Sequence, residues 1–140
     1  MRSVADFYQD CMACADALPP LDVKLADAVS CVLAEDVQAP FNLPVVDLAA
    51  CDGYAVRIRD CEGASLEGPV TLPVTEEIRA GAVDPAALVP GTAIRIASGA
   101  PLPTGAEAVV SLEFTDHGVA QVALRTSPAG GENIRRRAED

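Results

Sequence analysis

Three stretches of the 140-residue sequence combine residue types that can bind an oxyanion or a metal ion. Asp52 supplies a carboxylate, which can ligate a cation or accept hydrogen bonds. In a loop rich in Gly and Pro, the Ser98 hydroxyl and the Gly99 backbone N–H can donate hydrogen bonds to an oxyanion. Near the end of the chain, consecutive guanidinium groups can hold phosphate or another oxyanion in a bidentate manner: Arg135, Arg136 and Arg137.

Each of these stretches also has a purely structural interpretation, which stays open at this level. Asp52-Gly53 is a common turn sequence. The loop over residues 96–110 suits a rigid connector, and a run of charges is usually solvated or paired with an acidic surface. Cys11 and Cys14 form a CxxC pair, but structural zinc needs further ligands and a redox pair needs its first Cys at a helix N-terminus. Small packed side chains are therefore favoured for the two Cys.

The elements that position these residues begin with a helical stretch. Ser3 can cap a helix whose apolar residues recur at helical spacing up to Leu18, where two prolines end the pattern. This predicts an N-terminal helix within residues 1–20. A second helix is predicted over 26–33, inside a proline-punctuated connection that covers residues 21–45.

The middle of the chain, residues 46–128, is predicted to be all β. Short apolar runs are separated by turns rich in Gly and Pro, which favours a small barrel or sandwich. In one run, Ile94 and Ile96 are expected to face one way and Arg95 the other. The candidate strands are 53–57, 70–74, 77–80, 92–97, 108–114 and 119–125.

The last stretch, residues 129–140, leaves the β unit through Ser, Pro and Gly and ends on charged residues. The predicted fold class is mainly β with N-terminal helices. A small β-barrel or sandwich is inserted into an elongated α+β subdomain, whose flanking parts are residues 21–45 and 129–140.

Composition and charge restrict the classes of function. The formal net charge of −11 argues against a nucleic-acid binder, because such a surface repels polyphosphate. No apolar run approaches the ~18–20 residues that span a bilayer, so no membrane partner is expected. Five Cys at irregular spacing make a poor disulfide framework, and the polar N-terminus is unlike a secretion signal. The expected compartment is therefore the cytoplasm.

Three longer pieces of sequence are highly specific in combination: "LAEDVQAPFNLPVVDLAACDGYAVR", "GTAIRIASGAPLPTGAEAVVSLEFT" and "GENIRRRAED". Through them the sequence resembles the N-terminal part, domains I and II, of the molybdopterin molybdenumtransferase family, the MoeA and gephyrin E-domain type. The resemblance implies that the inserted β unit is the family's domain II. The flanking segments would then belong to its domain I.

The resemblance implies that molybdate is inserted into adenylylated molybdopterin with release of AMP, and that Mg²⁺ is the divalent cation. It also implies an elongated homodimer whose active clefts combine parts of both subunits. Because family members continue into a domain that holds the pterin nucleotide, this chain is expected to be a fragment that is inactive alone. The alternative is a stand-alone, non-catalytic β-barrel module that binds a protein partner.

The resemblance also assigns roles to single residues. Asp52, Arg137 and Asp140 are implied to be catalytic, and Asp52 and Asp140 to hold Mg²⁺. Because molybdate is a dianion, a carboxylate ~4 Å away repels it by about 4 kcal/mol per pair of unit charges at an effective dielectric of ~20, so a cation has to lie between them. The residues implied to bind substrate or oxyanion are Ser98, Gly99 and Arg136.

The sequence departs from the family's pattern close to these residues. Leu48 and Ala49 stand where Asn and Ser are usual, and Cys51 replaces Met. Ser98 replaces Thr, and Ala138 replaces the Gly that follows the arginines. Contacts that the usual groups make are expected to be lost at these positions.

Overall fold

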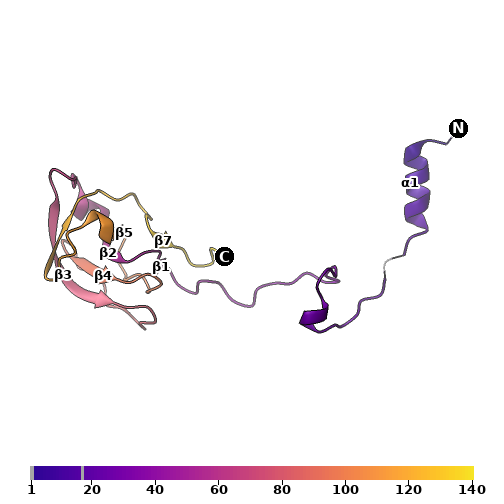
Figure 1. Ribbon diagram of the computed structural model, residues 1–140, viewed down its shortest axis with the longest axis horizontal. Coiled ribbons are helices and arrows are strands. Elements are labelled where there is room, and N and C mark those ends of the chain that lie inside the picture. Colours follow the sequence, from indigo (N-terminus) through magenta and orange to yellow (C-terminus); the bar gives the residue numbers. More distant parts are fainter. Residues whose placement is uncertain (1, 17) are drawn as a thin grey trace. The chain divides into compact units, whose positions relative to one another are not determined.

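The computed structural model describes residues 2–16 and 18–140 of the chain (Figure 1). The chain forms two compact units, Met1–Gln38 and Ala39–Asp140. In the described part of the first unit no side chain is buried, whereas the second unit contains the hydrophobic core. The fold that positions the candidate residues is therefore that of the second unit.

Helix α1, Val4–Ala13, is the predicted N-terminal helix. The Ser3 hydroxyl accepts a hydrogen bond from the Asp6 N–H at 3.1 Å, and the Asp6 carboxylate accepts one from the Ser3 N–H at 3.2 Å. This capping box satisfies backbone N–H groups that the first helical turn leaves without partners.

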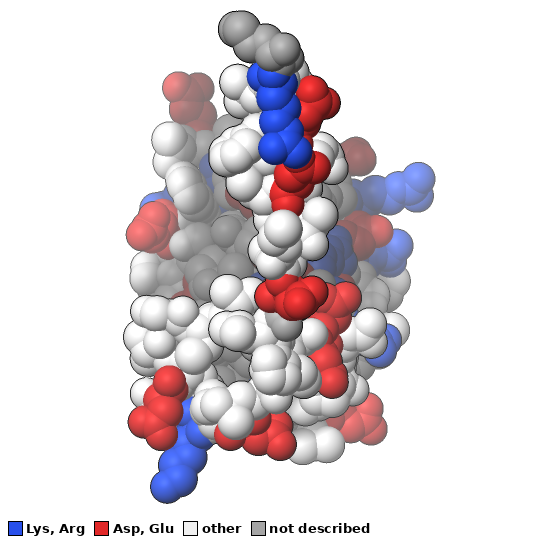
Figure 2. All heavy atoms as spheres, turned by 90° about the vertical axis from the view of Figure 1, so that its right-hand side faces the viewer, with Lys and Arg blue, Asp and Glu red and all other residues white. Residues whose placement is uncertain are grey.

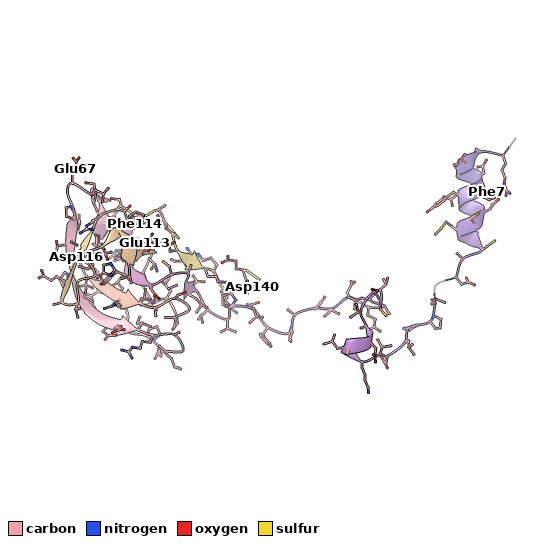
Figure 3. The ribbon with its side chains drawn as sticks, viewed as in Figure 1. Phe7, Glu67, Glu113, Phe114, Asp116 and Asp140 are labelled. Carbon is pink, nitrogen blue, oxygen red and sulfur yellow. The ribbon has the colours of Figure 1, made fainter. Side chains whose placement is uncertain are left out.

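The helix ends earlier than the sequence predicts. The apolar spacing predicts helix up to Leu18, but α1 ends at Ala13 and Leu18 is exposed; Ala17 lies outside the described residues. No residue of α1 is buried, and the Phe7 side chain, labelled in Figure 3, is 59% exposed. A short helix without a packing partner is not extended by propensity alone.

The prediction of a second helix over residues 26–33 is wrong. Only one turn of 3-10 helix forms, η1 at Leu25–Asp27, and Ser30 has a φ of 70° that interrupts helical geometry. The apolar stripe that suggested a helix remains exposed, at Val29, Val32 and Leu33. Helices this short need tertiary packing. In the described residues no helix is long and apolar enough to cross a bilayer.

The second unit is built on a five-stranded sheet, so the predicted mainly β class is confirmed (Figure 1). Its strand order is β5-β2-β4-β3-β6. All neighbouring strands are antiparallel except β3 and β4, which run parallel. The strands are β2 Gly53–Val56, β3 Val70–Ile78, β4 Ala93–Ile96, β5 Ala108–Ser111 and β6 Gln121–Leu124.

Two of the predicted strand boundaries are wrong. The segments 70–74 and 77–80 form one continuous strand, β3, which passes through a register shift between Val74 and Glu76. This shift has the form of a β-bulge, which bends a strand without ending it. The strand predicted over 108–114 ends at Ser111, because the Ser111 hydroxyl caps the 3-10 turn η3, Leu112–Phe114, by accepting from the Glu113 N–H.

Both faces of the central strands are buried. In β2, Tyr54 and Val56 belong to one hydrophobic cluster and Ala55 to the other. In β4, Ile94 and Ile96 share the second cluster, as their alternation predicts. The polar end of buried Tyr54 is satisfied, since its hydroxyl donates to the Gly118 carbonyl at 2.8 Å. A strand covered on both faces has no exposed polar side, which explains the unbroken apolar run of β2.

The edge of β6 is covered by the loop that follows η3. The Arg125 N–H donates to the Phe114 carbonyl, and the Asp116 carboxylate accepts from the N–H groups of Ala123 at 2.9 Å and Gly118 at 3.1 Å. These hydrogen bonds lower the pKa of Asp116, the one to Ala123 most. The loop therefore leaves β6 without a fully open edge.

A short second sheet joins the two ends of the unit. Strand β1, Leu48–Ala49, pairs antiparallel with β7, Ile134–Arg135. The segment that follows the β unit thus returns beside the segment that precedes it. The turn η2, Ile58–Cys61, follows β2. The proposed division into domains at residues 20, 45 and 128 stays a prediction.

Gly53 is required by a close approach between β2 and β5. A Cβ on Gly53 would lie 2.1 Å from the Val110 carbonyl oxygen, which is far inside contact distance. We expect Gly53→Ala to lower the free energy of unfolding by about 2 kcal/mol or more in urea unfolding of the chain. Gly68→Ala is the matched control, since a Cβ there meets only the Ser65 hydroxyl at 3.6 Å. Equal urea midpoints for Gly53→Ala and Gly68→Ala would contradict the close approach of Gly53 to the Val110 carbonyl.

The hydrogen bonds of Asp116 predict that the chain loses stability in acid. The pKa of Asp116 is lowered in the folded state. Its contribution to the free energy of unfolding is therefore present above the unfolded pKa of about 3.9 and is lost as the pH falls through the folded value. Asp116→Asn keeps an acceptor oxygen but cannot titrate. We expect wild type to exceed Asp116→Asn in stability by about 0.5–1 kcal/mol at pH 6, and the gap to narrow below pH ~4. A gap independent of pH would contradict this role.

Candidate functional site

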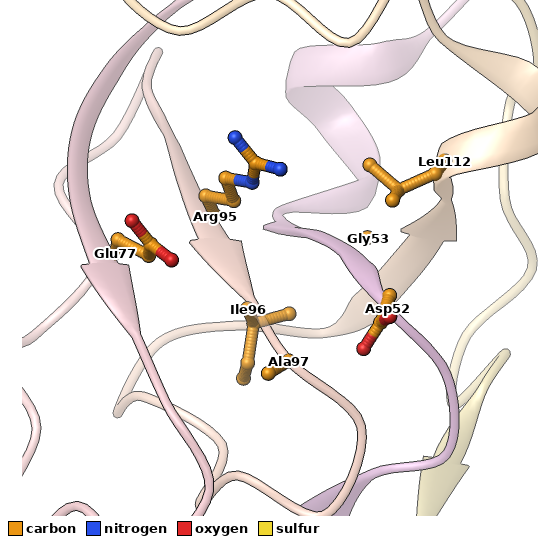
Figure 4. Close-up of a pocket in the computed structure, with 7 residues that line it drawn as sticks. All are labelled: Asp52, Gly53, Glu77, Arg95, Ile96, Ala97 and Leu112. Atoms are coloured by element: carbon orange, nitrogen blue, oxygen red, sulfur yellow. The ribbon is translucent and has the colours of Figure 1, made fainter.

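Asp52 lies in the turn between β1 and β2, beside a shallow pocket of about 150 Å³ (Figure 4). Its Oδ1 accepts a hydrogen bond from the Ser98 N–H at 2.7 Å. The side chains of Glu77 and Arg95 lie on neighbouring strands β3 and β4 and line the same pocket. The structure therefore brings the predicted Asp52 and Ser98 together, and adds two charged groups that sequence analysis did not assign to the site.

Ser98 and Gly99 are held against β1. The Ser98 hydroxyl donates to the Ala50 carbonyl at 3.3 Å. The Gly99 N–H donates to the Ala49 carbonyl at 2.8 Å, and Gly99 has a φ of 75°, which favours glycine. Because this N–H already has a partner, it is not directed outward as the predicted oxyanion cradle requires. The loop fixes the Asp52 carboxylate, and its role in oxyanion binding stays a prediction.

Arg95 is the one cationic side chain among the described residues that line this pocket. Within the described residues no hydrogen bond or ion pair to its guanidinium is formed, although Glu77 is its cross-strand partner. Burial raises the pKa of neighbouring Tyr54, while Arg95 opposes that shift. The pocket is thus lined by one guanidinium and two carboxylates. The signal in the sequence was the alternation "AIRIA", which directs Arg95 away from Ile94 and Ile96.

The arginine run is held by Asp47, a residue that sequence analysis missed. Its Oδ2 accepts from Arg136 Nη1 at 2.8 Å, and its Oδ1 accepts from the Arg137 backbone N–H at 2.8 Å. The bond from the Arg137 N–H, followed by that from Arg136, lowers the pKa of Asp47. Nothing in the spacing of "VVD" singled this carboxylate out, because its partners lie about ninety positions away.

The other arginines of the run also have partners in the same unit. Arg135 forms an ion pair with Asp140, which raises the pKa of Arg135. With its amide oxygen facing Arg137, Asn42 accepts from Nε and Nη2 at 3.0 Å each. All three guanidinium groups are therefore engaged within the chain. The structural interpretation of the run, pairing with an acidic surface of the same protein, applies to Arg135 and Arg136.

Asp52 and Asp140 do not meet within this chain. Strand β1 pairs with β7 in antiparallel register, so the residues after β1 run away from those after β7. The Asp140 N–H donates to the Leu43 carbonyl, whereas Asp52 contacts Ser98. In the part of the chain that the structure describes, no group of three or more His, Cys, Asp or Glu side chains could hold a metal ion.

The donor set at Asp52 nevertheless fits a hydrated Mg²⁺. This ion takes one or two carboxylates and completes its shell with water or substrate oxygens. Asp52 is exposed, and only its Oδ1 accepts a hydrogen bond from the protein. One carboxylate oxygen therefore remains for an ion, while Asp140 contributes none from the same chain.

The cysteines do not form a metal or disulfide centre in the described residues. All five are free, and Cys11 and Cys14 are exposed rather than packed, because α1 buries nothing. Cys51 is half-buried beside Asp52, and burial raises its pKa while a hydrogen bond with Ser111 opposes the shift. Burial raises the pKa of Cys61 to about 11, so this thiol stays protonated in the core at neutral pH.

Comparison with known protein families shows to which family the chain belongs. The family described as MoeA N-terminal region (domain I and II) matches residues 2–140. The chain belongs to this family. It is 49% identical to Molybdopterin molybdenumtransferase 2 of Mycobacterium tuberculosis over 140 residues, which are 100% of this chain and 35% of the relative. It is 40% identical to Molybdopterin molybdenumtransferase of Bacillus subtilis over 122 residues, covering 84% of this chain and 28% of the relative.

Solved structures agree with the MoeA assignment. A molybdopterin biosynthesis MoeA protein from Pyrococcus horikoshii has a TM-score of 0.75 and 38% sequence identity, and the match covers 84% of this chain and 31% of that chain. The chain thus spans about a third of the length of the MoeA proteins it matches. The family and the mainly β fold are thereby established.

The hydrogen bond between Asp52 and Ser98 can be tested by stability. Asp52→Ala removes the acceptor of the Ser98 N–H and is expected to lower the free energy of unfolding by about 1 kcal/mol. Asp52→Asn retains an amide oxygen at that position and is expected to stay within about 0.5 kcal/mol of wild type. Urea unfolding followed by circular dichroism measures both. Glu67→Ala is the control, because Glu67 is an exposed residue (labelled in Figure 3). If Asp52→Ala were as stable as Glu67→Ala, the hydrogen bond between Asp52 and Ser98 would be refuted.

Proposed function

We propose that this chain is the N-terminal part of a molybdopterin molybdenumtransferase, which inserts molybdate into adenylylated molybdopterin and releases AMP. The observation that carries the proposal is the match to the MoeA N-terminal region over residues 2–140. The relatives named molybdenumtransferase are about three times as long, so the chain is proposed to supply one side of the active cleft. The complete enzyme is proposed to be a cytoplasmic homodimer.

Asp52 is proposed to orient a hydrated Mg²⁺ beside the substrate oxyanion. Support comes from its exposed carboxylate, which the Ser98 N–H fixes through one oxygen only. When bound, the ion would neutralise charge between carboxylate and dianion and polarise a substrate oxygen. The Arg95 side chain lines the same pocket, and its guanidinium is proposed to bind an oxyanion there.

Arg136, Arg137 and Asp140 are proposed to act at a cleft that two subunits form together. Within one chain they lie beyond the far end of the β1–β7 pair from Asp52, so joint action with Asp52 requires a second subunit. The engaged arginines would have to exchange Asp47, Asn42 or Asp140 for substrate, or act by orienting these partners.

Nucleic acid is a poor candidate partner. Acidic side chains, red in Figure 2, are spread more widely than basic ones on the face shown, and the net charge is −11. A non-catalytic protein-binding module remains the second candidate function. The observation that favours it is Leu48 and Ala49 in β1, where apolar side chains replace the family's usual Asn and Ser.

A chimera tests the proposed activity. The matching 35% of the Mycobacterium tuberculosis Molybdopterin molybdenumtransferase 2 is replaced by this chain, and AMP release from adenylylated molybdopterin is measured with molybdate and Mg²⁺. We expect turnover that depends on both additions. Asp52→Asn should fold but lose turnover about tenfold or more, the scale expected when a residue that orients a metal is lost.

Glu67→Gln in the same chimera is the control and should retain full turnover. An Asp52→Asn chimera with unchanged turnover would refute the role of Asp52. A folded wild-type chimera without turnover would refute the enzymatic proposal and favour the protein-binding module.

A further inference from the structure

Asp47 contacts two consecutive residues of the arginine run with separate oxygens of one carboxylate. Oδ2 accepts from the Arg136 side chain, and Oδ1 accepts from the Arg137 backbone N–H. A single exposed ion pair contributes little to stability, partly because two long side chains must be ordered. The Arg137 N–H, however, belongs to the backbone, so this bond fixes the path of the chain without that entropy.

The backbone of Asp47 connects to the loop on its other side. Its carbonyl accepts from the Leu102 N–H at 2.9 Å. Two residues along, Ala49 donates to the Ala100 carbonyl and accepts from the Gly99 N–H. Asp47 therefore touches the arginine run through its side chain and the Ser98-containing loop through its main chain.

The two connected segments carry most of the proposed site residues. The Ser98 N–H holds Asp52 at 2.7 Å, and this loop is fixed to β1. The arginine run is fixed to β1 by pairing of Leu48 with Arg135 and by the Asp47 carboxylate. The distance and orientation between the two segments thus depend on the short stretch around Asp47.

We propose that Asp47 is a positioning residue that holds Arg136 and Arg137 in fixed register with the loop of Ser98, so that each segment presents its groups to the cleft in which it acts. This inference rests on the proposed function and adds a residue to it. Asp47 does not contact the pocket at Asp52; it acts through the residues it holds.

The two hydrogen bonds that the Asp47 carboxylate accepts from Arg136 and Arg137 form a clamp, and its chemistry predicts how substitutions behave. The Asn in Asp47→Asn has one acceptor oxygen and one donor NH₂, so it cannot accept from Arg136 and Arg137 through two separate oxygens as Asp47 does. Asp47→Glu retains both oxygens and is expected to restore part of the function. Asp116→Asn is a matched control, because Asp116 also accepts two backbone N–H bonds but lies at the edge of β6.

The clamp itself is tested in the 140-residue chain by a double-mutant cycle. Urea unfolding is measured for wild type, Asp47→Asn, Arg136→Gln and the double variant. We expect the effects on the folded-to-unfolded ratio to be non-additive by about threefold or more, as for directly coupled residues. Additive effects would overturn the clamp.

The positioning role is tested in the chimera, at a temperature where each variant is shown to be folded. We expect Asp47→Asn to lower kcat/KM for molybdate about tenfold, Asp47→Glu to recover part of it, and Asp116→Asn to leave it unchanged. A folded Asp47→Asn chimera with wild-type kcat/KM, or one that loses no more activity than Asp116→Asn, would overturn the positioning role. A wild-type chimera without turnover refutes the proposed function instead, and the double-mutant cycle then still decides whether the clamp exists.

Discussion

Residues 47–50 exchange backbone hydrogen bonds on both sides, and the arrangement of the candidate site depends on this one short segment. On one side it bonds to the loop of residues 97–102 through Gly99, Ala100 and Leu102. On the other it bonds to the returning segment, where the Ala50 N–H donates to the Asn133 carbonyl. A chain segment bonded on both sides is constrained in register as a central strand is, although β1 itself is only two residues long. The predicted oxyanion loop and the arginine run are therefore parts of one hydrogen-bonded assembly.

The sheet behind this segment is rigid for a different reason. The central strands are covered on both faces by aliphatic side chains, and β2 approaches β5 so closely that only glycine fits at position 53. Asp52 is thus attached to the start of a fully buried strand, which limits how far its carboxylate can move. A carboxylate exposed beside the start of a buried strand combines a fixed position with access to solvent.

Those parts of the fold and of the candidate site that have a local cause could be predicted from the sequence. The cap at Ser3 and the alternation of Ile94 and Ile96 follow from short patterns, whereas the hydrogen bond from the Ser98 N–H to Asp52 was not predicted. The failures have tertiary causes. The helix predicted over 26–33 has no surface to pack against, and the bulge that joins two expected strands into β3 depends on its neighbour β4. Asp47 was missed because its partners are distant in sequence. The separation of Asp52 from Asp140 within one chain follows only from the β1–β7 register, which no short sequence pattern shows.

Amide hydrogen exchange in the 140-residue chain tests the central claim most directly. The N–H groups of Gly99, Leu102 and Arg137 donate to Ala49 or Asp47, and the Ala49 N–H of β1 donates to the Ala100 carbonyl of the loop. The account therefore predicts that these four amides exchange together, with protection close to that of the amides that pair β2 with β4. Exchange of these four amides at the rate of residues 18–38, which bury nothing, would show that the loop and the arginine run are not held by a common segment, and would contradict the account.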